Sequence, residues 1–142
     1  MSCVFCAIVA REAPAIRIHE DDGYLAILDS RPFTRGHTLV LPKRHTADLS
    51  DTPPETLAGM VTIGQRIALA ARSTELADAT NIGINDGRAA FQTVPHIHLH
   101  VLPRRNGDKL SLATGMLLRR DADGESTGRI LRAALARIDS GK

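Results

Sequence analysis

The chain has 142 residues, of which 43% are hydrophobic and 24% are charged, so it is long enough for one domain with one core and too short for two. Its net charge of +2, one Tyr, three Phe and no Trp argue against a duplex DNA binder and against an aromatic platform for single strands. The sequence contains no apolar run of about 18 residues, so no membrane span is predicted. The N-terminus lacks the pattern of a signal peptide, so we expect a cytoplasmic location.

The first part of the chain predicts a short helix followed by three strands. Residues 3–10 are apolar and compact, and Pro14 marks the end of this helix. Alternating apolar residues bounded by turn-forming residues and prolines are typical of strands. We expect strands at residues 16–20, 24–28 and 37–41.

The second part predicts a long helix, two more strands and a last helix. Thr52 and Glu55 lie three residues apart with Pro53 between them, which indicates a capping box and a helix that runs to about Leu76. The helix is expected to lay an apolar stripe on the sheet: Leu57, Met60, Val61, Ile67, Ala68 and Ala71. The remaining elements are strands at residues 82–85 and 96–102 and a helix from about Ser126. This order predicts a single α+β domain with a mainly antiparallel sheet.

Three of the six histidines, His96, His98 and His100, alternate along the last strand. Side chains alternate between the two faces of a strand, so these imidazoles should share one face. The other face then carries Ile97, Leu99 and Val101. Three readings stay open: ordinary hydrogen-bonded histidines, ligands of one metal ion, or covalent phosphoryl chemistry. The last is favoured, because a neutral imidazole is a good nucleophile near pH 7 and neighbouring donors can neutralise phosphoryl oxygens.

Both cysteines lie in one Cys-x-x-Cys near the N-terminus, at Cys3 and Cys6. A structural disulfide is not expected in a reducing compartment. A metal site, a redox pair and two separate thiols remain open, and zinc would need about four ligands in all.

The stretch from Gln92 to Leu102 resembles the histidine triad (HIT) family, whose motif is His-φ-His-φ-His-φ-φ with φ apolar. The resemblance extends through residues 24–29 and 36–45 and to Asn85, and it covers about the first 105 residues. It implies a HIT-like fold with a core domain over residues 1–105. Residues 106–142 are then expected to form a C-terminal extension packed on the same domain.

The resemblance also implies a role for each matching residue. His98 is expected to be the nucleophile that becomes nucleotidylated, His37 to hydrogen-bond and orient it, and His100 to contact the scissile phosphate or the leaving group. The resemblance implies phosphate and leaving-group contacts at Asn85, Gln92 and Thr93, ribose contacts at Asp29, and a base pocket of Phe5 and Ile27 with Val4 and Ile8.

Some members of the wider superfamily hold structural zinc with two cysteines, a distant histidine and the first triad histidine. The resemblance therefore implies a structural zinc ion on Cys3, Cys6, His45 and His96, and no organic cofactor is expected. His96 is also one of the four candidate catalytic histidines. If it binds zinc it cannot be a mobile proton donor, and protonation of the leaving group would pass to His100, Thr93 or water.

The expected function is a nucleotidyl hydrolase or transferase that attacks the α-phosphate of nucleoside 5′-phosphate derivatives. The substrates would be purine phosphoramidates or dinucleoside polyphosphates, with water or phosphate as the acceptor. The alternatives are a non-catalytic nucleotide-binding or interaction module and a metal-dependent hydrolase that uses the three histidines as ligands. The expected partners are a nucleotide and a second copy of the chain, because family members of this size are generally homodimers.

Overall fold

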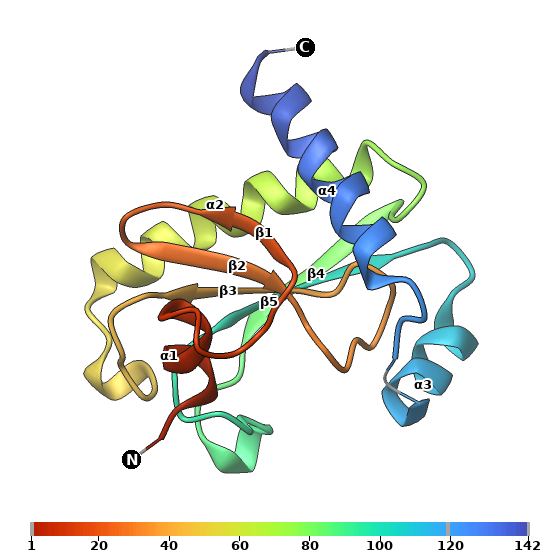
Figure 1. The fold of residues 1–142 in the computed structure, drawn as a ribbon. Coiled ribbons are helices and arrows are strands. Elements are labelled where there is room, and N and C mark those ends of the chain that lie inside the picture. Colours follow the sequence, from red (N-terminus) through yellow and green to blue (C-terminus); the bar gives the residue numbers. More distant parts are fainter. Residues whose placement is uncertain (1, 119, 142) are drawn as a thin grey trace.

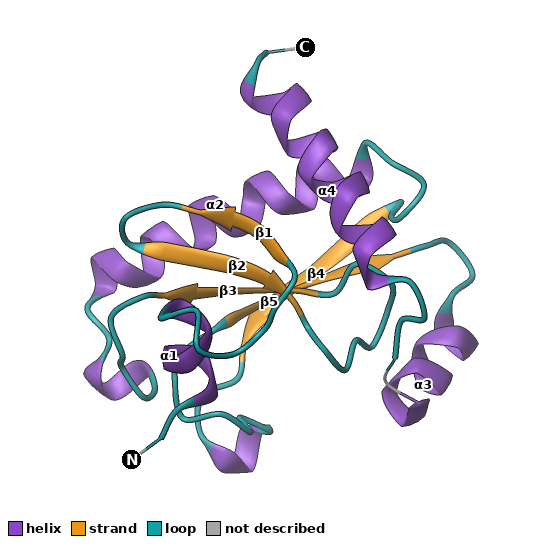
Figure 2. Cartoon of the chain, in the orientation of Figure 1, coloured by secondary structure: helices purple, strands orange, loops and turns teal. Residues whose placement is uncertain are grey.

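The computed structural model describes residues 2–118 and 120–141, and it shows one five-stranded antiparallel sheet with helices on both faces (Figure 1). The strands, in the spatial order β1-β2-β3-β5-β4, are β1 (Arg17–Glu20), β2 (Tyr24–Leu28), β3 (Thr38–Pro42), β5 (Leu99–Arg104) and β4 (Ala79–Ile84). The helices are α1 (Val4–Val9), α2 (Pro54–Arg72), α3 (Lys109–Leu118) and α4 (Gly124–Asp139). Figure 2 shows α2 running along one side of the sheet and α1 lying on the other. Within the described ranges, no helix is both long enough and apolar enough to cross a membrane.

Each face of the sheet packs into its own apolar cluster, as expected where side chains alternate along a strand. The smaller cluster lies under α1 and consists of Phe5, Ile8, Leu25, Ile27, Leu39 and Leu41. The larger cluster lies under α2 and α4 and includes Ala26, Val40, Ile67, Ile97, Leu99, Val101 and Leu131. The predicted α+β class with a mainly antiparallel sheet is therefore confirmed, and α1 lies on the face opposite to Ile97, Leu99 and Val101.

The long helix begins one residue later and ends four residues earlier than predicted. Thr52 forms no capping box, because its hydroxyl donates to the backbone carbonyl of Asp48. Pro53 occupies the N-cap position with no side-chain cap, and Pro54 is the first helical residue. The structure instead places a capping box in the short 3₁₀ turn before the helix, between Asp48 and Asp51.

The last two strands are also displaced from their predicted positions. β4 begins at Ala79, because pairing with β5 extends the ladder to Ala79–Arg104. β5 begins at Leu99 rather than at His96, since the backbone N–H of Ile97 donates to Thr46 outside the sheet. Pro103 does not end β5 but lies within it.

The C-terminal segment contains one predicted helix and one that the sequence pattern did not reveal. α4 begins at Gly124, and its Leu131, Ala134 and Leu135 lie in the larger cluster. The helix that was not predicted, α3, buries no residue, so it has no apolar stripe toward the core. A Cβ at Gly115 would lie 1.8 Å from the carbonyl oxygen of Phe33, so only glycine lets α3 approach this loop so closely. The proposed boundary at residue 105 stays a prediction.

Replacing Leu131 with Ala tests whether α4 unfolds together with the sheet. Leu131 is 0% exposed, so the substitution should remove packing and leave a cavity, lowering the free energy of unfolding by about 2–5 kcal/mol. Denaturant unfolding followed by circular dichroism measures this change. Leu117→Ala is the matched control, because Leu117 is 85% exposed and its loss should change stability by less than about 0.5 kcal/mol. A Leu131→Ala effect as small as the control's would contradict a shared core.

Candidate active site

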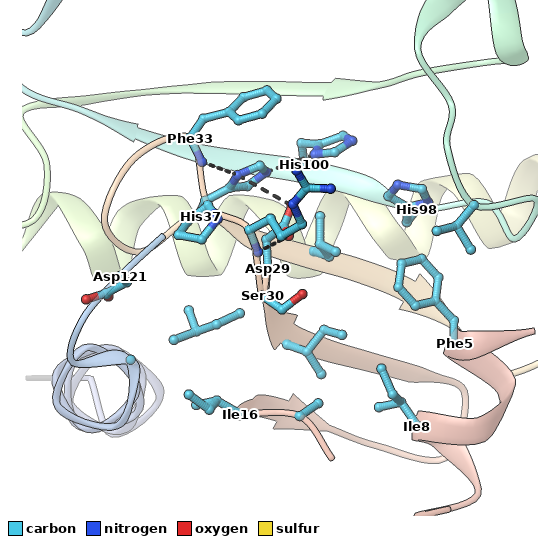
Figure 3. A pocket seen from close by; sticks show the side chains of 18 of the residues that line it. Phe5, Ile8, Ile16, Asp29, Ser30, Phe33, His37, His98, His100 and Asp121 are labelled. Carbon is cyan, nitrogen blue, oxygen red and sulfur yellow. Dashed lines mark hydrogen bonds and ion pairs between the residues drawn. The ribbon is translucent and has the colours of Figure 1, made fainter. Parts of the chain in front are cut away.

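A cavity of about 960 Å³ lies on the α1 side of the sheet and receives residues from three parts of the chain. Figure 3 shows His98 beside Phe5 at one end and Asp121 at the other, with Asp29 between them. Three walls enclose it: the α1–β2 region, the connection between β4 and β5, and the C-terminal segment. A nucleoside monophosphate would fill only part of this volume, so the cavity has room for a second group.

The ring of His98 is oriented by a hydrogen bond from one of its nitrogens. Its Nδ1 lies 2.8 Å from the backbone carbonyl oxygen of His96, and a carbonyl can only accept, so Nδ1 donates. The lone pair of a neutral ring is then on Nε2. Burial lowers the pKa of His98, outweighing the His96 carbonyl and the Asp29 carboxylate, which act in the opposite direction. A neutral imidazole with its lone pair on Nε2, in a residue that lines the cavity, is the form that can attack phosphorus.

We expected His37 to form a hydrogen bond with His98, but the structure shows it bonded to His100. Its Nε2 lies 2.9 Å from Nδ1 of His100. The Phe33 backbone N–H donates to Nδ1 of His37 (3.1 Å), so the hydrogen of His37 is on Nε2 and is donated to His100. The difference follows from the strand register: His37 directly precedes β3, whose Leu39 pairs with His100 of β5, so His37 lies diagonally across from His100, whereas His98 precedes β5. His37 therefore orients His100, whose ring centroid is 5.0 Å from that of His98.

The residues expected to bind a nucleoside lie along the α1–β2 wall of the cavity. Phe5 packs edge-on against His98, with ring centroids 5.0 Å apart. Asp29 lies at the end of β2, where Oδ1 accepts the Arg31 backbone N–H and Oδ2 is 3.6 Å from Nδ1 of His37. The apolar members of this wall are Val4, Phe5, Ile8, Ile27 and Leu39. The structure thus places the expected base-pocket residues and the ribose carboxylate in one cavity with His98.

Two of the three residues expected to contact phosphate line the cavity, and one does not. Asn85 and Thr93 are lining residues. The side chain of Gln92 is instead buried in the loop, where it donates to the carbonyls of Ala47 (2.6 Å) and Val94 (3.0 Å) and accepts from the Gly87 backbone N–H. Its amide group is thus fully engaged by backbone, and the expected phosphate contact at Gln92 is corrected to a role in holding the loop.

Cys3, Cys6, His45 and His96 form a compact donor cluster outside the cavity. Nδ1 of His96 is 3.4 Å from Sγ of Cys3, 3.6 Å from Sγ of Cys6 and 3.2 Å from Nδ1 of His45. A tetrahedral zinc ion with about 2.3 Å Zn–S and about 2.0–2.1 Å Zn–N bonds separates two nitrogen ligands by roughly 3.3 Å and a nitrogen from a sulfur ligand by roughly 3.6 Å. Nε2 of His96 lies 2.8 Å from the Pro42 carbonyl, the kind of outer contact that fixes the tautomer of a metal-ligating histidine. The donor set fits structural zinc.

This cluster removes His96 from the catalytic candidates. Both ring nitrogens of His96 are engaged, one in the cluster and one by Pro42, and the side chain is fully buried. A single metal site made of the three alternating histidines is therefore not formed. A second group of possible metal donors consists of Asp29, His37 and His100. Both ring nitrogens of His37 already take part in hydrogen bonds, one with the Phe33 backbone N–H and one with His100.

The cavity also contains residues that the sequence pattern did not single out: Arg31, Phe33, Phe91, Met116, Asp121 and Glu125. The last three come from the C-terminal segment. A relay fixes this segment to the loop between β2 and β3, because Arg35 Nε donates to Thr127 Oγ1 and the Thr127 hydroxyl donates to Asp121, each at 2.8 Å. Only contact across the tertiary structure brings these groups to the site, so no local pattern signals them.

Comparison with known proteins gives four informative matches. The model of the HIT domain matches residues 10–107. An uncharacterized HIT-like protein of Mycobacterium tuberculosis is 79% identical over 99% of this chain and 97% of its own length. The crystal structure of a zinc-bound histidine triad family protein from Mycobacterium smegmatis is 69% identical, with a TM-score of 0.92 over 100% of this chain and 99% of that chain. The adenosine 5′-monophosphoramidase HNT1 of Saccharomyces cerevisiae is 33% identical over 97% of this chain and 84% of its own length.

Proposed function

Since the chain belongs to the HIT domain family, we propose that it is a nucleotidyl hydrolase or transferase that forms a covalent nucleotidyl intermediate on His98. One observation carries this proposal: a buried imidazole whose pKa is lowered by burial, whose Nδ1 donates to the His96 carbonyl, and which lines a cavity with room for a nucleotide and a second group. The hydrogen-bonded pair of His37 and His100 lies directly beside it.

The reaction proceeds by two displacements at the α-phosphorus. The lone pair on Nε2 of His98 forms a bond to phosphorus while the bond to the leaving group breaks, and the leaving group departs with the electron pair. It takes a proton from His100, Thr93 or water. In the second step water attacks the same phosphorus and gives a proton to the group that protonated the leaving group, the P–Nε2 bond breaks, and nucleoside monophosphate leaves with neutral His98 restored. A phosphate ion in place of water would make the protein a phosphorylase.

The proposed substrates are nucleoside 5′-phosphate derivatives, with adenosine phosphoramidates first. The name of the yeast relative supports a P–N bond and an adenosine moiety. The apolar wall around Ile27 suits a purine, and the Asp29 carboxylate suits ribose hydroxyls. Dinucleoside polyphosphates are the second substrate class, favoured by a cavity larger than one nucleotide.

Structural zinc is part of the proposal. The donor set of Cys3, Cys6, His45 and His96 and the zinc-bound relative support it. When bound, the ion would supply a cross-link that joins the start of α1, the end of β3 and the triad segment. The catalytic steps belong to residues of the cavity and not to this ion.

The arrangement in solution is proposed to be a cytoplasmic homodimer. Apolar side chains on the outer face of α2 and on the edge strand β4 are exposed: Val61, Leu69 and Ile82. Burying this face against a second copy would remove apolar surface from water. Sedimentation equilibrium at micromolar concentration tests the dimer.

Incubation with adenosine 5′-phosphoramidate and with diadenosine polyphosphates tests the proposed activity. We expect release of AMP, with the substrates ranked by kcat/KM. A non-catalytic binding module would bind these compounds and release no product, and this outcome would overturn the enzymatic proposal.

Replacing Asp29 with Ala should reduce the preference for ribonucleotides. Hydrogen bonds to a charged group contribute about 1.5–3 kcal/mol, so kcat/KM for the ribonucleotide should fall about 10- to 100-fold. The matched 2′-deoxy substrate lacks one of the hydroxyls, so its kcat/KM should fall much less. Because the ratio of the two substrates is measured in one variant, a partial folding defect cancels. An unchanged ratio would remove Asp29 from the ribose site.

A further inference from the structure

Phe91 is an aromatic side chain displayed at the mouth of the active-site cavity. It lines the cavity, yet it is 83% exposed, so the core does not account for its presence. Its φ is +70°, in the left-handed region that glycine adopts without cost and that a bulky side chain rarely adopts. Neither burial nor backbone preference therefore explains a phenylalanine at this position.

The loop that carries Phe91 is closed on itself and rigid. Gly87 N–H donates to Oε1 of Gln92 at 2.8 Å, and the Gln92 backbone N–H donates back to the Gly87 carbonyl at 3.1 Å. The Gln92 side chain also ties the loop to Ala47. The Phe91 N–H completes the turn by donating to the Arg88 carbonyl. The ring is therefore presented in advance of binding, which lowers the entropic cost of using it as a contact.

Phe91 lies on another part of the cavity lining than the residues expected to bind the nucleoside. Those residues belong to α1 and β2, whereas Phe91 belongs to the β4–β5 connection, together with Asn85 and Thr93, where phosphate and leaving-group contacts are expected. The cavity volume beyond that of one nucleotide leaves room for a second group, and the exposed ring of Phe91 is available to contact it.

We propose that Phe91 forms a leaving-group subsite that stacks against a planar aromatic ring. The inference rests on the proposed function and specifies its substrates: nucleoside 5′-phosphates whose leaving group carries an aromatic ring. The ring is either the second base of a dinucleoside polyphosphate or an aromatic amine in P–N linkage. Every such ring has a π-face, so one phenyl platform accepts both.

The test compares an aromatic leaving group with ammonia in the same variants. Adenosine 5′-phosphoramidate releases ammonia, and its tryptamine derivative and diadenosine tetraphosphate release groups with aromatic rings. We expect Phe91→Gly, which suits the left-handed backbone, to lower the ratio of kcat/KM for the aromatic substrates over the ammonia substrate about tenfold. Phe91→Tyr should keep the ratio, and the Tm of Phe91→Gly should not fall. The diadenosine and tryptamine arms show which source of the ring the subsite prefers.

A hydrolysis-resistant analogue separates this inference from the proposed function. A methylene-bridged adenosine phosphonate with an indole arm should lose about tenfold in affinity in Phe91→Gly, while its methyl-armed counterpart keeps its Kd. Leu117→Ala, an equally exposed apolar residue outside the cavity lining, should change neither Kd nor the ratio. If no substrate turns over but the indole arm depends on Phe91, the subsite stands and the enzymatic proposal fails. An unchanged ratio and unchanged affinity, or a parallel loss on all substrates with a lowered Tm, would overturn the subsite.

Discussion

His98→Ala should lower kcat/KM for adenosine 5′-phosphoramidate by at least about 10⁴-fold, with the fold intact. Removing the nucleophile of a covalent mechanism typically costs factors of this size or larger, because no other group can form the intermediate. Rapid-quench mass spectrometry of the wild type with a slow substrate should show a mass gain of one nucleoside monophosphate. The adduct should be absent from His98→Ala, whose far-UV circular dichroism should match the wild type.

His19→Ala is the matched control for this experiment. His19 lies on β1, where its ring bonds to Asp21, and it does not line the cavity. The control should turn over substrate at the wild-type rate and form the adduct. If His98→Ala retained the parental rate, the covalent mechanism would have to be abandoned, although the HIT fold would not be affected.

The sequence was sufficient to predict most of the sheet, because the chain alternates clearly and its turns contain glycine and proline. β2 lies at the predicted residues 24–28, and the apolar partners of the triad histidines lie on the other face as expected, where they pack under α2. The errors occur where tertiary contacts override local signals. The Thr52 hydroxyl donates to the Asp48 carbonyl and does not cap the helix, and Pro103 lies inside β5. α3 was not predicted, because none of its residues is buried and it therefore has no periodic apolar face.

The family resemblance indicated several residues that lie near one another at the candidate site, but not their hydrogen bonds. It grouped His98, His100, Asp29 and Asn85, and the structure brings these four residues to one cavity, whereas Gln92 does not line it. Hydrogen-bond partners depend on strand register and loop geometry, which no spacing rule contains. The pairing of His37 with His100 follows from the register of β3 and β5.

The Cys/His cluster and the proposed nucleophile, His98, are joined through one residue. His96 gives its ring to the cluster and its backbone carbonyl to Nδ1 of His98. The contact to Pro42 fixes the other ring nitrogen. Whatever holds the His96 ring therefore also holds the carbonyl that selects the tautomer of His98. We expect loosening of the cluster to affect catalysis through this carbonyl and through folding, and not by removing a reacting group.

Removing zinc should lower stability strongly. An ion bound to the folded state alone, with free zinc at 1,000 times its Kd, contributes about 4 kcal/mol. For a chain of this size such a loss corresponds to a decrease in Tm of roughly 10–20 °C. The purified protein should contain one zinc ion per chain by inductively coupled plasma mass spectrometry. Cys3→Ser should bind less than the wild type and should melt lower by a similar amount.

Chelator treatment of both proteins distinguishes a structural from a catalytic ion. A strong chelator should lower the Tm of the wild type and have almost no further effect on Cys3→Ser, because that variant has already lost a ligand from the four-donor set. Activity at a temperature where the chelated protein is still folded should be reduced but not abolished, since His98 and His100 lie in the cavity and outside the cluster, and only the His96 carbonyl that orients His98 depends on the cluster. Activity that disappears in proportion to zinc while the circular dichroism is unchanged would favour the metal-dependent hydrolase. A wild-type protein that contains no zinc and melts at the same temperature with chelator would overturn the structural site.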